Sequence, residues 1–509
     1  MGKYALTATR LLLCLVMPGL LYCQTKPAAK PQAALDLVAL RKYIQERMEA
    51  ASIPSIAVSV VQGKQILWEE GFGLADRERR IPATPHTSFY LASVTKALTG
   101  TALMVLLDHK KINLDHPVNE YLGPAKVHSP MWETTQATVR RVATHTAGLT
   151  TYYRKCALRD TKCEVSTETA IERYGILFWP PGEHFDYSNL GYGILGEVIS
   201  HVSGKSYADF LRSEVFLPLG MQDCSLGVEG GGSSEIAAQY DSTSGARTPV
   251  ELSDTPGASS MHCSVHDLAL FGMFALGAHL PAQKRILSKA SLRMMLNPTV
   301  ETGEGERYGF GWSRQPDHHG YVGVFAQGGT SDSFAVLQMI PSEKIAVAVI
   351  ANTGTTVPFE IADRVLSDLL PRYRARLASE PPAAPRRDPA VIATTTSLAG
   401  NWAGALQTWK GNIPLTLRIS ASREVQAKWK DDQWITATDV GIAEPRFYCV
   451  LHGQMEIPDA PQPPYDLELE LYLRKTALVG AATTKNEAQL PYWVQLEKSP
   501  QTQADGPTQ

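Results

Sequence analysis

Ser93 and Lys96 form the one Ser-x-x-Lys segment of the chain, Ser93-Val94-Thr95-Lys96. A serine hydroxyl is a weak nucleophile until a base takes its proton, and a lysine amine can act as that base when burial lowers its proton affinity. On a helix, residues three apart share a face with Cβ atoms about 5–6 Å apart, so these two side chains can meet. The spacing therefore predicts covalent catalysis, although a serine helix cap followed by a surface lysine has the same pattern.

Two further segments carry polar residues where a catalytic cleft would need them. Tyr187-Ser188-Asn189 follows the turn-forming stretch Trp179-Pro180-Pro181-Gly182, and Gln327-Gly328-Gly329-Thr330 leads into an apolar strand. In this order, the three segments resemble the motifs of the serine β-lactamase and penicillin-binding-protein superfamily, specifically its class C-like and esterase-like branch. That family uses Ser-x-x-Lys, then Tyr-x-Asn, then a Lys- or His-x-Gly triplet on a strand edge.

The resemblance extends from about Leu35 to Arg372. It includes the phrases Thr144-His145-Thr146-Ala147-Gly148-Leu149, in which His145 is expected to be structural, and Tyr308-Gly309-Phe310-Gly311-Trp312. It implies an α/β (α+β) domain of the β-lactamase/transpeptidase type, with a mainly antiparallel sheet flanked by helices. It also implies a serine hydrolase that forms an acyl-enzyme with ester, amide or lactam substrates.

Carried over to this chain, the resemblance implies that Ser93 attacks the substrate and that Lys96 and Tyr187 share the proton transfers. Which of these two is the base in each step stays open. The backbone N–H groups of Ser93 and Thr330 would form the oxyanion hole, where such a donor lowers the barrier by about 2.7–4 kcal/mol. The implied substrate-binding residues are Asn189, Gln327, Gly328 and Gly329. No cofactor or metal ion is expected.

Gln327 departs from the family pattern, because the family carries Lys or His at this position. The cation that could hold a substrate carboxylate is therefore missing, and charge-assisted hydrogen bonds are about twice as strong as neutral ones. β-Lactams and D-alanyl peptides end in a carboxylate, whereas simple esters and many amides do not. We therefore expect neutral acyl substrates to be preferred.

The elements that must position these residues follow from hydrophobic periodicity. Helices are expected at Leu35–Ala50, Ser93–Asp108, Tyr207–Phe216, Val265–Leu276 and Phe359–Leu370. The helix that begins at Ser93 is almost wholly apolar after its first turn, which predicts burial. Strands are expected as a hairpin at Ser55–Val61 and Gln65–Glu70, and as a pair at Ser333–Ile340 and Lys344–Asn352. Because strands lie at both ends of residues 35–373, we expect one sheet to join the two ends.

A second unit is expected at the C-terminal end. Residues 374–397 have a linker-like composition rich in Ala and Pro. In residues 398–498, apolar residues alternate in two runs, Ile413 to Ile419 and Leu467 to Leu473, with the two-residue period of half-buried strands. Gly400-Asn401-Trp402 resembles the opening of lipocalin-like barrels, so a small all-β barrel is expected, followed by a disordered tail at 499–509.

The first residues have the features of an export signal. Lys3 and Arg10 precede the apolar run Leu11–Tyr22, which predicts a signal peptide at 1–23 and a spacer at 24–34. The run is shorter than the roughly 20 residues of a membrane-spanning helix. We expect an exported protein, periplasmic or extracellular. Cys23 is a candidate lipid anchor that would make it a lipoprotein, although Tyr22 stands where lipoprotein processing favours a small residue.

The net charge limits the classes of partner that this protein can bind. With 48 Lys and Arg against 51 Asp and Glu, the net charge is -3 and no long run of either sign occurs, which argues against nucleic acid. The expected partner is a small-molecule or short-peptide acyl substrate, and the oligomeric state stays open.

Five cysteines follow the signal region, namely Cys156, Cys163, Cys224, Cys263 and Cys449, so at least one thiol is free. Cys156 and Cys163 either form a short disulfide or stay unpaired.

Two alternatives remain beside the hydrolase. A catalytically silent sensor or ligand-binding protein would keep the pocket while its third motif drifts, and the barrel could be the part that recognises the ligand. His262 and His266 lie four apart on an expected helix, a spacing that suits a metal, but no motif supplies a third ligand, so they are expected to be a helix surface and cap. His318 and His319 are adjacent and would face opposite ways on a strand.

Overall fold

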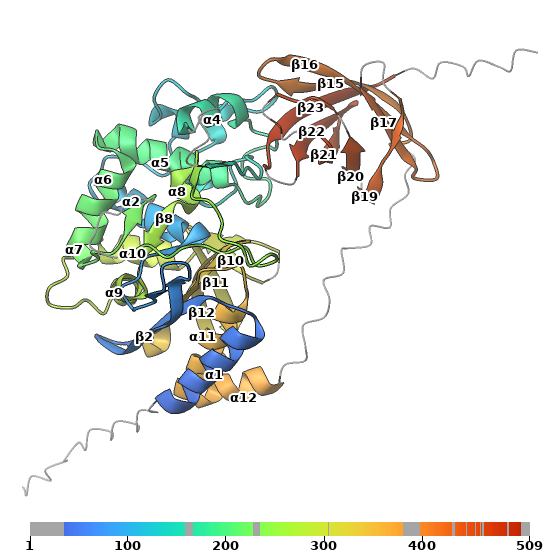
Figure 1. Ribbon diagram of the computed structural model, residues 1–509. Helices are drawn as coiled ribbons and strands as arrows, with labels where there is room; N and C mark the ends of the chain where they lie inside the picture. Colours follow the sequence, from blue (N-terminus) through green and yellow to red (C-terminus); the bar gives the residue numbers. More distant parts are fainter. Residues whose placement is uncertain are drawn as a thin grey trace, which may run out of the picture.

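The computed structural model describes residues 35–157, 166–227, 235–303, 305–379, 398–429, 433–443, 445–453, 455–458, 460, 463–485 and 488–499. The expected signal peptide and spacer, residues 380–397 of the expected linker, and the expected tail beyond Ser499 lie outside these residues. Figure 1 shows a larger α/β body that ends at Ser379 and a smaller all-β body that begins at Leu398. Within the described residues, no helix combines the length and apolar character needed to cross a membrane.

A nine-stranded antiparallel sheet forms the centre of the larger body, with the order β3-β2-β1-β14-β13-β12-β11-β10-β9. The strands are β1 (Ser55–Gln62), β2 (Gln65–Asp76), β3 (Ile81–Pro82), β9 (Val300–Glu301), β10 (Arg307–Gly309), β11 (Trp312–His318), β12 (Tyr321–Thr330), β13 (Ser333–Ile340) and β14 (Ile345–Ala351). β1 pairs with β14 from Ile56 opposite Ala351 to Gln62 opposite Ile345. The sheet therefore joins the two ends of this region, as the sequence predicted.

Helices cover both faces of the sheet (Figure 1). On one face, Ile56, Val58 and Val60 of β1 pack in a cluster that includes α1 (Leu37–Ala50), α11 (Val357–Leu369) and α12 (Pro371–Ser379). On the other face, α9 (Val265–Ala275) packs against β1 and β14, and α2 (Thr95–Asp108) contacts β12. Because β1 is covered on both sides, its buried residues, Ser55 to Val61, are all apolar or small. The helix α12 continues to Ser379, beyond the expected end of this unit at residue 373.

Shorter elements complete this body and connect the sheet to the cleft. They are η1 (Ala92–Val94), η2 (Val118–Glu120), η3 (Thr134–Gln136), α3 (Val139–Ala143), α4 (Thr167–Tyr174), α5 (Asn189–Ser203), α6 (Tyr207–Leu211), η4 (Arg212–Phe216), α7 (Leu217–Leu219), α8 (Pro256–Ser259), α10 (Lys289–Leu296) and η5 (Pro341–Glu343). A three-stranded sheet combines β4 (Phe89–Tyr90), β8 (Met261–Cys263) and β6 (Ser225–Leu226), and β5 (Lys155–Ala157) pairs with β7 (Glu251–Ser253).

The smaller body is a single nine-stranded antiparallel sheet that curls into a nearly closed barrel, with the order β18-β17-β16-β15-β23-β22-β21-β20-β19. Its strands are β15 (Gly400–Thr408), β16 (Gly411–Ile419), β17 (Val425–Trp429), β18 (Ile435–Thr436), β19 (Thr438–Ala443), β20 (Arg446–Gly453), β21 (Tyr465–Arg474), β22 (Ala477–Thr484) and β23 (Pro491–Lys498). Leu467, Leu469 and Leu471 of β21 are buried, whereas the residues between them are half-buried. The predicted alternation and the predicted all-β fold are confirmed.

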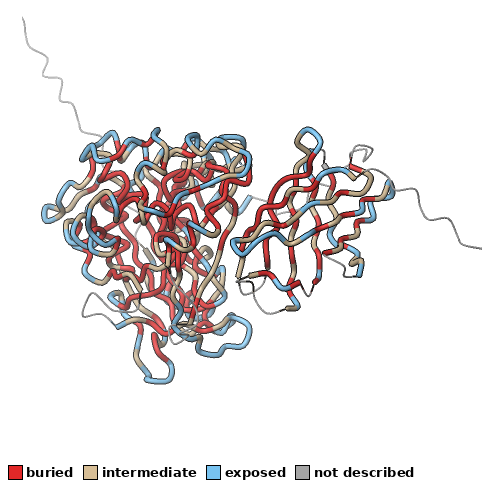
Figure 2. The backbone as a smooth tube through the Cα atoms, turned by 90° about the horizontal axis from the view of Figure 1, so that it is seen from above, coloured by how far each residue is buried: buried red, intermediate tan, exposed pale blue. Residues whose placement is uncertain are grey.

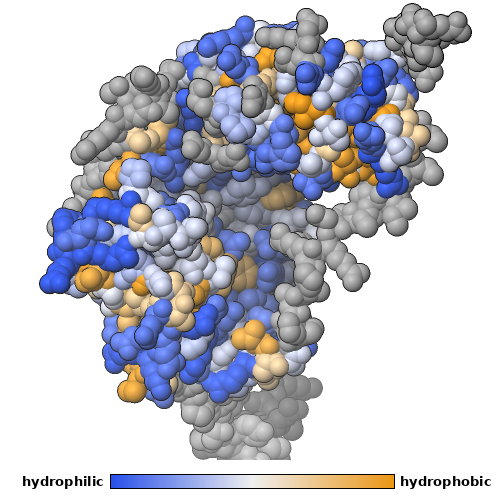
Figure 3. All heavy atoms as spheres, turned by 45° about the vertical axis from the view of Figure 1, so that its right-hand side comes forward, coloured by the Kyte–Doolittle hydropathy of each residue, from blue (hydrophilic) through white to orange (hydrophobic). Residues whose placement is uncertain are grey.

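The barrel packs against the α/β body through an aromatic contact. Trp179 and Phe178 of the α/β body form a buried cluster with Val479, Ala481 and Trp493 of the barrel. Figure 2 shows the two bodies side by side, each with its buried residues inside. On the face shown in Figure 3, hydrophilic residues predominate and the surface is hollowed between the two bodies. This buried contact therefore fixes the position of the barrel on the α/β body.

A disulfide joins Cys224 to Cys263, across a sequence separation of 39 residues. This bond was not predicted. Cys156 is also disulfide-bonded, so it is not unpaired; Cys163, its candidate partner, lies outside the described residues. Cys449 is a buried free cysteine in the barrel, which agrees with the odd number of cysteines that follow the signal region.

Candidate active site

Ser93 lies in the turn η1, directly before the buried helix α2. The phrase Tyr308-Gly309-Phe310-Gly311-Trp312 crosses this helix in close contact. A Cβ built on Gly100 would lie 2.0 Å from the carbonyl oxygen of Phe310, and one on Gly311 would lie 2.2 Å from that of Lys96. Because any larger residue at these two positions would push the segments apart, the glycines explain why this phrase accompanies the Ser-x-x-Lys motif.

Lys96 is almost completely buried, and three groups surround its amine. Its Nζ lies 3.0 Å from Ser93 Oγ, 2.8 Å from Asn189 Oδ1 and 3.0 Å from the carbonyl oxygen of Ala258. Burial lowers the pKa of the Lys96 ammonium well below its ordinary value. A neutral amine has two N–H donors and one lone pair, so the oxygens of Asn189 and Ala258 can accept both donors. The lone pair is then left for the Ser93 hydroxyl, which is the arrangement of a base.

Tyr187 approaches the same hydroxyl from a second element, the segment that leads into α5. Its phenol donates a hydrogen bond to Ser93 Oγ at 2.9 Å. Burial raises the pKa of Tyr187 to about 12, against the opposing effect of the hydrogen bond with Ser93. The phenol therefore keeps its proton at neutral pH. Ser93 Oγ lies between a buried amine and a phenol that still carries its proton.

Asn189 begins α5, and both ends of its amide are fixed. Its Oδ1 accepts from Lys96, and its Nδ2 donates to the carbonyl oxygen of Tyr152 at 3.0 Å. Ser188 caps the same helix by accepting from the N–H of Gly191 at 3.1 Å. The cap and the amide contacts together hold the Tyr-x-Asn segment against α2. The roles of Tyr152 and Ala258 were not predicted, because a backbone carbonyl acceptor leaves no mark in a sequence.

His145 packs against Tyr187 and forms a hydrogen bond with Ser188, the residue that caps α5. Its Nδ1 accepts the N–H of Ser188 at 3.1 Å, and its ring lies 4.5 Å from that of Tyr187 and 4.7 Å from that of Tyr308, measured between ring centres. Burial, with the neighbouring Lys96, lowers the pKa of His145 well below its ordinary value, so the ring is neutral. These contacts are those of a packing residue, which fits the structural role expected for it.

The third motif lies at the end of β12, next to Ser93. Gln327 and Gly329 are exposed to the cleft, whereas Gly328 is buried against η1. A Cβ on Gly328 would lie 2.3 Å from the backbone nitrogen of Ser93. Thr330 donates from its hydroxyl to Asp332 at 2.6 Å, and Asp332 also accepts from Thr248 at 2.8 Å. The structure therefore brings all eight residues named from the three motifs to one place.

Two cavities meet at this point and share Gly329 in their walls. The first has a volume of about 490 Å³, and its lining includes Ser93, Lys96, Tyr187, Gln327 and Tyr308. The second has a volume of about 770 Å³, and its lining includes Asn189, Thr330, Lys155, Glu251 and Gln489. A substrate whose reacting carbonyl lies at Ser93 has room on both sides.

One wall of the second cavity comes from the barrel. Gln489 lies between β22 and β23, and its backbone exchanges two hydrogen bonds with Tyr153, at 2.9 Å and 2.8 Å. Its side-chain oxygen accepts from the hydroxyl of Thr151 at 3.2 Å. The barrel thus reaches the cleft through this backbone bridge. No local pattern around Gln489 predicts this contact, since it depends on how the two bodies pack.

The expected placement of two histidine pairs was wrong. His262 lies on β8 and His266 in the first turn of α9, so they do not share a helix. His318 ends β11 and His319 has a positive φ of 50° in the following turn. Their rings therefore lie on the same side, with centres 4.6 Å apart. In both cases a strand ends or a turn begins between the two residues, which breaks the assumed periodicity.

Curated relatives match this chain at low identity. "Protein flp" of Staphylococcus aureus is 26% identical over 322 residues, which are 62% of this chain and 62% of that protein. "Unguisins hydrolase ungD'" of Aspergillus campestris is 27% identical over 363 residues, or 65% of this chain and 66% of that protein. The chain thus spans about 62% of the length of the staphylococcal relative.

Solved structures share the fold. The octameric penicillin-binding protein homologue from Pyrococcus abyssi is 22% identical, with a TM-score of 0.57 over 91% of this chain and 100% of that chain. SurE is 20% identical, with a TM-score of 0.60 over 89% of this chain and 98% of that chain. A class C β-lactamase from Rhodobacter sphaeroides is 23% identical, with a TM-score of 0.54 over 65% of this chain and 98% of that chain.

The family model for β-lactamases matches residues 40–370. This range contains Ser93, Lys96, Tyr187 and Asn189, and it ends after the strand edge with Gln327. It also agrees with the extent of the resemblance found in the sequence. With its α/β fold and these motifs gathered at one cleft, the chain belongs to the β-lactamase family.

Proposed function

We propose that this protein is a serine hydrolase in which Ser93 forms an acyl-enzyme. The observation that carries the proposal is the environment of Ser93 Oγ, which lies 3.0 Å from Lys96 Nζ and 2.9 Å from the phenol oxygen of Tyr187. Lys96 is buried and Tyr187 is half-buried, and the loss of water around them lowers the pKa of the amine and raises the pKa of the phenol to about 12. The hydrolase named among the relatives supports the same class of reaction.

In the proposed mechanism, the neutral Lys96 amine takes the proton of Ser93 as its oxygen bonds to the substrate carbonyl carbon. The backbone N–H groups of Ser93 and Thr330 hold the resulting oxyanion. As the bond to the leaving group breaks, that group takes the proton of the Tyr187 phenol, and the Lys96 ammonium returns a proton to the phenolate. Water then attacks the acyl-enzyme, with the same groups moving its proton, and releases the acid and free Ser93.

The substrates that fit best are neutral esters or amides. Gln327 is the residue that faces the first cavity where the family carries a cation, so nothing at this position would select a carboxylate. SurE, which shares the fold, has also been solved with D-Leu, and D-amino acid amides are therefore a natural second substrate to test. Gln489 and its neighbours in the second cavity would limit the size of the acyl group.

We also propose that the protein is exported to the periplasm or the extracellular space. The support is the charged and apolar pattern of the first 22 residues, together with the Cys224–Cys263 disulfide. Disulfides persist in oxidising compartments and are rare in the cytosol. Lipid modification at Cys23 remains part of this proposal. Labelling cells with a lipid precursor, for wild type and Cys23→Ala, distinguishes an anchored from a free form.

The test of the hydrolase proposal is turnover of p-nitrophenyl esters, D-amino acid amides and nitrocefin by wild type and Ser93→Ala. Ser200→Ala is a matched control, because this serine lies on α5 and its hydroxyl donates to the carbonyl oxygen of Gly196 in the same helix, at 3.1 Å. Loss of turnover in Ser93→Ala alone supports the proposal. Stable labelling of Ser93 by a fluorophosphonate, with no turnover of any substrate, supports the catalytically silent sensor instead.

A further inference from the structure

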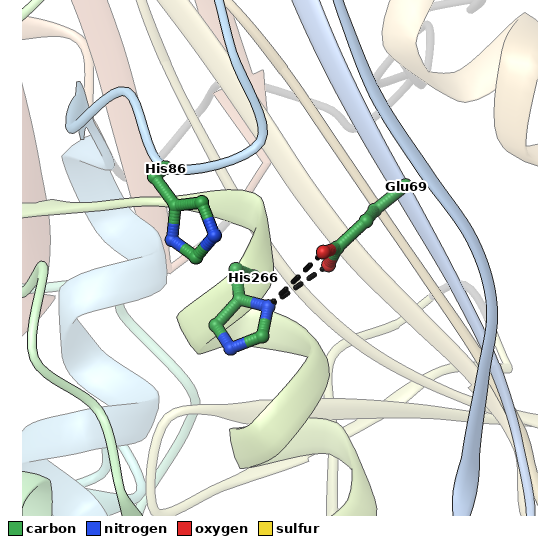
Figure 4. A group of neighbouring side chains, drawn as sticks. All are labelled: Glu69, His86 and His266. Atoms are coloured by element: carbon green, nitrogen blue, oxygen red, sulfur yellow. Dashed lines mark hydrogen bonds and ion pairs between the residues drawn. The ribbon is translucent and has the colours of Figure 1, made fainter.

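Away from the catalytic cleft, two histidines and a glutamate from three separate segments meet at the surface. Glu69 belongs to β2, His86 to the turn before β4, and His266 to the first turn of α9. One ligand atom from each residue lies within 4.8 Å of the other two. Figure 4 shows both rings and the carboxylate gathered around one small space. The three residues are far apart in sequence, so only the fold brings them together.

The spacing of these groups is close to that of a metal site. His266 Nδ1 lies 3.0 Å and 3.3 Å from the two carboxylate oxygens of Glu69. The rings of His86 and His266 have their centres 4.6 Å apart. Ligands about 2.1 Å from a tetrahedral Zn²⁺ are about 3.4 Å from one another. Glu69 and His266 already have this separation, and the His86 side chain, which is 56% exposed, has room to close the remaining gap.

The orientation of His86 also suits a ligand. Its Nδ1 lies 2.9 Å from a carboxylate oxygen of Asp223, which is largely buried and also accepts from the hydroxyl of Ser264 at 3.0 Å. A histidine that donates Nδ1–H to a carboxylate keeps Nε2 unprotonated, and metal-bound histidines are commonly held in this way. Asp223 therefore prepares Nε2 of His86 to bind a cation.

The backbone around the site is held in place. Cys224 and Cys263, the neighbours of Asp223 and Ser264, form the disulfide. Ser264 caps α9 by accepting from the N–H of Asp267 at 3.1 Å. The N–H of His266 donates to the carbonyl oxygen of Pro85 at 3.2 Å, which ties α9 to the turn that carries His86. Little ordering of the main chain would be needed when a ligand binds.

We propose that Glu69, His86 and His266 form a binding site for a divalent transition metal, with Zn²⁺ as the ion that fits best and water as the fourth ligand. Two imidazoles and one carboxylate are a ligand set that Zn²⁺ accepts, whereas Ca²⁺ and Mg²⁺ prefer oxygen ligands throughout. The ion joins β2, the turn before β4 and α9. It stabilises the segment that leads through β4 to Ser93, and it is independent of the proposed hydrolase reaction.

A second group of the same residue types, His318, His319 and Asp363, is a weaker candidate. His318 Nε2 already lies 2.7 Å from the hydroxyl of Tyr373, and that hydroxyl donates to Asp363 at 2.6 Å. A metal would have to break these hydrogen bonds of Tyr373, whose side chain is buried. At the first site, by contrast, Glu69 and His266 are only half-buried, with 25% and 28% of their side chains exposed, so water reaches their contact and it contributes little to stability.

The test is calorimetric titration of the untagged, chelator-treated full chain with ZnCl₂, supported by the visible absorption of a Co²⁺ complex. We expect one ion per chain. His86→Ala, His266→Ala and Glu69→Gln should each weaken binding at least 10-fold, and Asp223→Asn should weaken it by about 10-fold to 100-fold. Thermal unfolding of each metal-free variant checks that it still folds.

His116→Ala is the matched control. His116 Nδ1 lies 3.0 Å from a carboxylate oxygen of Glu120, so it too is a histidine paired with a glutamate, but Glu120 and His116 belong to neither group of metal-type side chains in the described part of the chain. Its replacement should leave Zn²⁺ affinity unchanged. The proposal is overturned if wild type binds no Zn²⁺, or if His86→Ala and His266→Ala bind it as tightly as wild type and His116→Ala do.

Discussion

Gly328 and Ser93 are in direct backbone contact: a Cβ built on Gly328 would lie 2.3 Å from the nitrogen of Ser93 and 2.6 Å from the carbonyl oxygen of Leu91. The end of β12 and the turn that carries Ser93 therefore form one surface. The geometry of the proposed oxyanion hole, which takes one N–H from each segment, depends on this contact.

Gly328→Ala should separate the two segments and lower kcat/KM by about 100-fold, because one misplaced oxyanion donor costs about 10²–10³ in rate. The measurement is ester hydrolysis, with thermal unfolding to check the fold. Gly123→Ala is the control, since a Cβ there meets only the His201 ring, at 3.7 Å. Equal rates for Gly328→Ala and wild type would contradict a donor at this strand end.

The buried amine of Lys96 should make stability depend on pH. In the unfolded chain this lysine titrates near 10.5, whereas in the folded protein burial lowers its pKa well below that value. Between the two values the unfolded chain binds more protons, so the free energy of unfolding rises with pH, by up to about 1.4 kcal/mol per pH unit. Lys96→Met lacks this contribution, and wild type should gain stability relative to the variant as pH rises toward 10.5.

Urea unfolding midpoints of wild type and Lys96→Met at several pH values measure this difference. Lys42→Met, on the exposed surface of α1, serves as the control. A difference between wild type and Lys96→Met that stays constant from neutral pH to about pH 10 would show that Lys96 is charged in the folded protein, and the neutral amine could not then be the base.

Gln327→Lys should shift substrate preference toward compounds that carry a carboxylate. The new ammonium would face the first cavity, where charge-assisted bonds are about twice as strong as neutral ones. We expect kcat/KM for a penicillin-type substrate to rise about 10-fold relative to a neutral ester, which corresponds to about 1.4 kcal/mol. Gln327→Met removes the amide without adding charge. Its kcat/KM for the penicillin-type substrate, relative to that for the neutral ester, should be lower than in the lysine variant.

Gln489→Ala should raise KM for substrates with large acyl groups and leave kcat nearly unchanged, because this side chain lines the second cavity without touching Ser93. Its backbone bridge to Tyr153 would persist. Gln495→Ala is the matched control within the barrel, since its amide reaches Glu497 on the same strand, at 3.5 Å. If Gln489→Ala changes KM equally for substrates with large and with small acyl groups, the barrel does not select the acyl group.

Replacing Cys224 and Cys263 together by serine should lower the free energy of unfolding by about 2–4 kcal/mol, because the disulfide restricts a loop of the unfolded chain. Chemical unfolding of wild type and the double variant measures the loss. Ester hydrolysis at low temperature should change little, since neither cysteine lines the two cavities at the active site. An unchanged unfolding midpoint would mean that the bond does not form in the isolated protein.

The features that the sequence predicted correctly are those that depend on local patterns of residues. The helix after Ser93 is almost wholly apolar, the residues of β21 alternate strictly, and the Tyr187 segment follows a turn and leads into a helix. Each of these features concerns neighbouring residues, so periodicity and turn chemistry suffice. The family resemblance then connected the three motifs, and the family model and the solved structures confirmed the family and the fold.

The remaining features depend on contacts between distant segments. The carbonyl oxygen of Ala258 completes the environment of Lys96, and Gln489 reaches Tyr153 from another body. Nothing near these residues in the sequence distinguishes them from others of their type. His266 is a further example. The sequence suggested His262, four residues away, as its partner, but in the structure its partner is Glu69 on β2.

The pairing of β1 with β14 has a consequence for how the chain is made. Every residue of the three motifs has been synthesised before Ile345 emerges, yet until then β1 lacks its inner partner. Sheets closed by such distant strands form slowly, and an unpaired apolar strand edge can associate with another chain. Fragments that stop before β14 therefore carry all the side chains proposed to be catalytic and are expected to aggregate rather than to hydrolyse substrate.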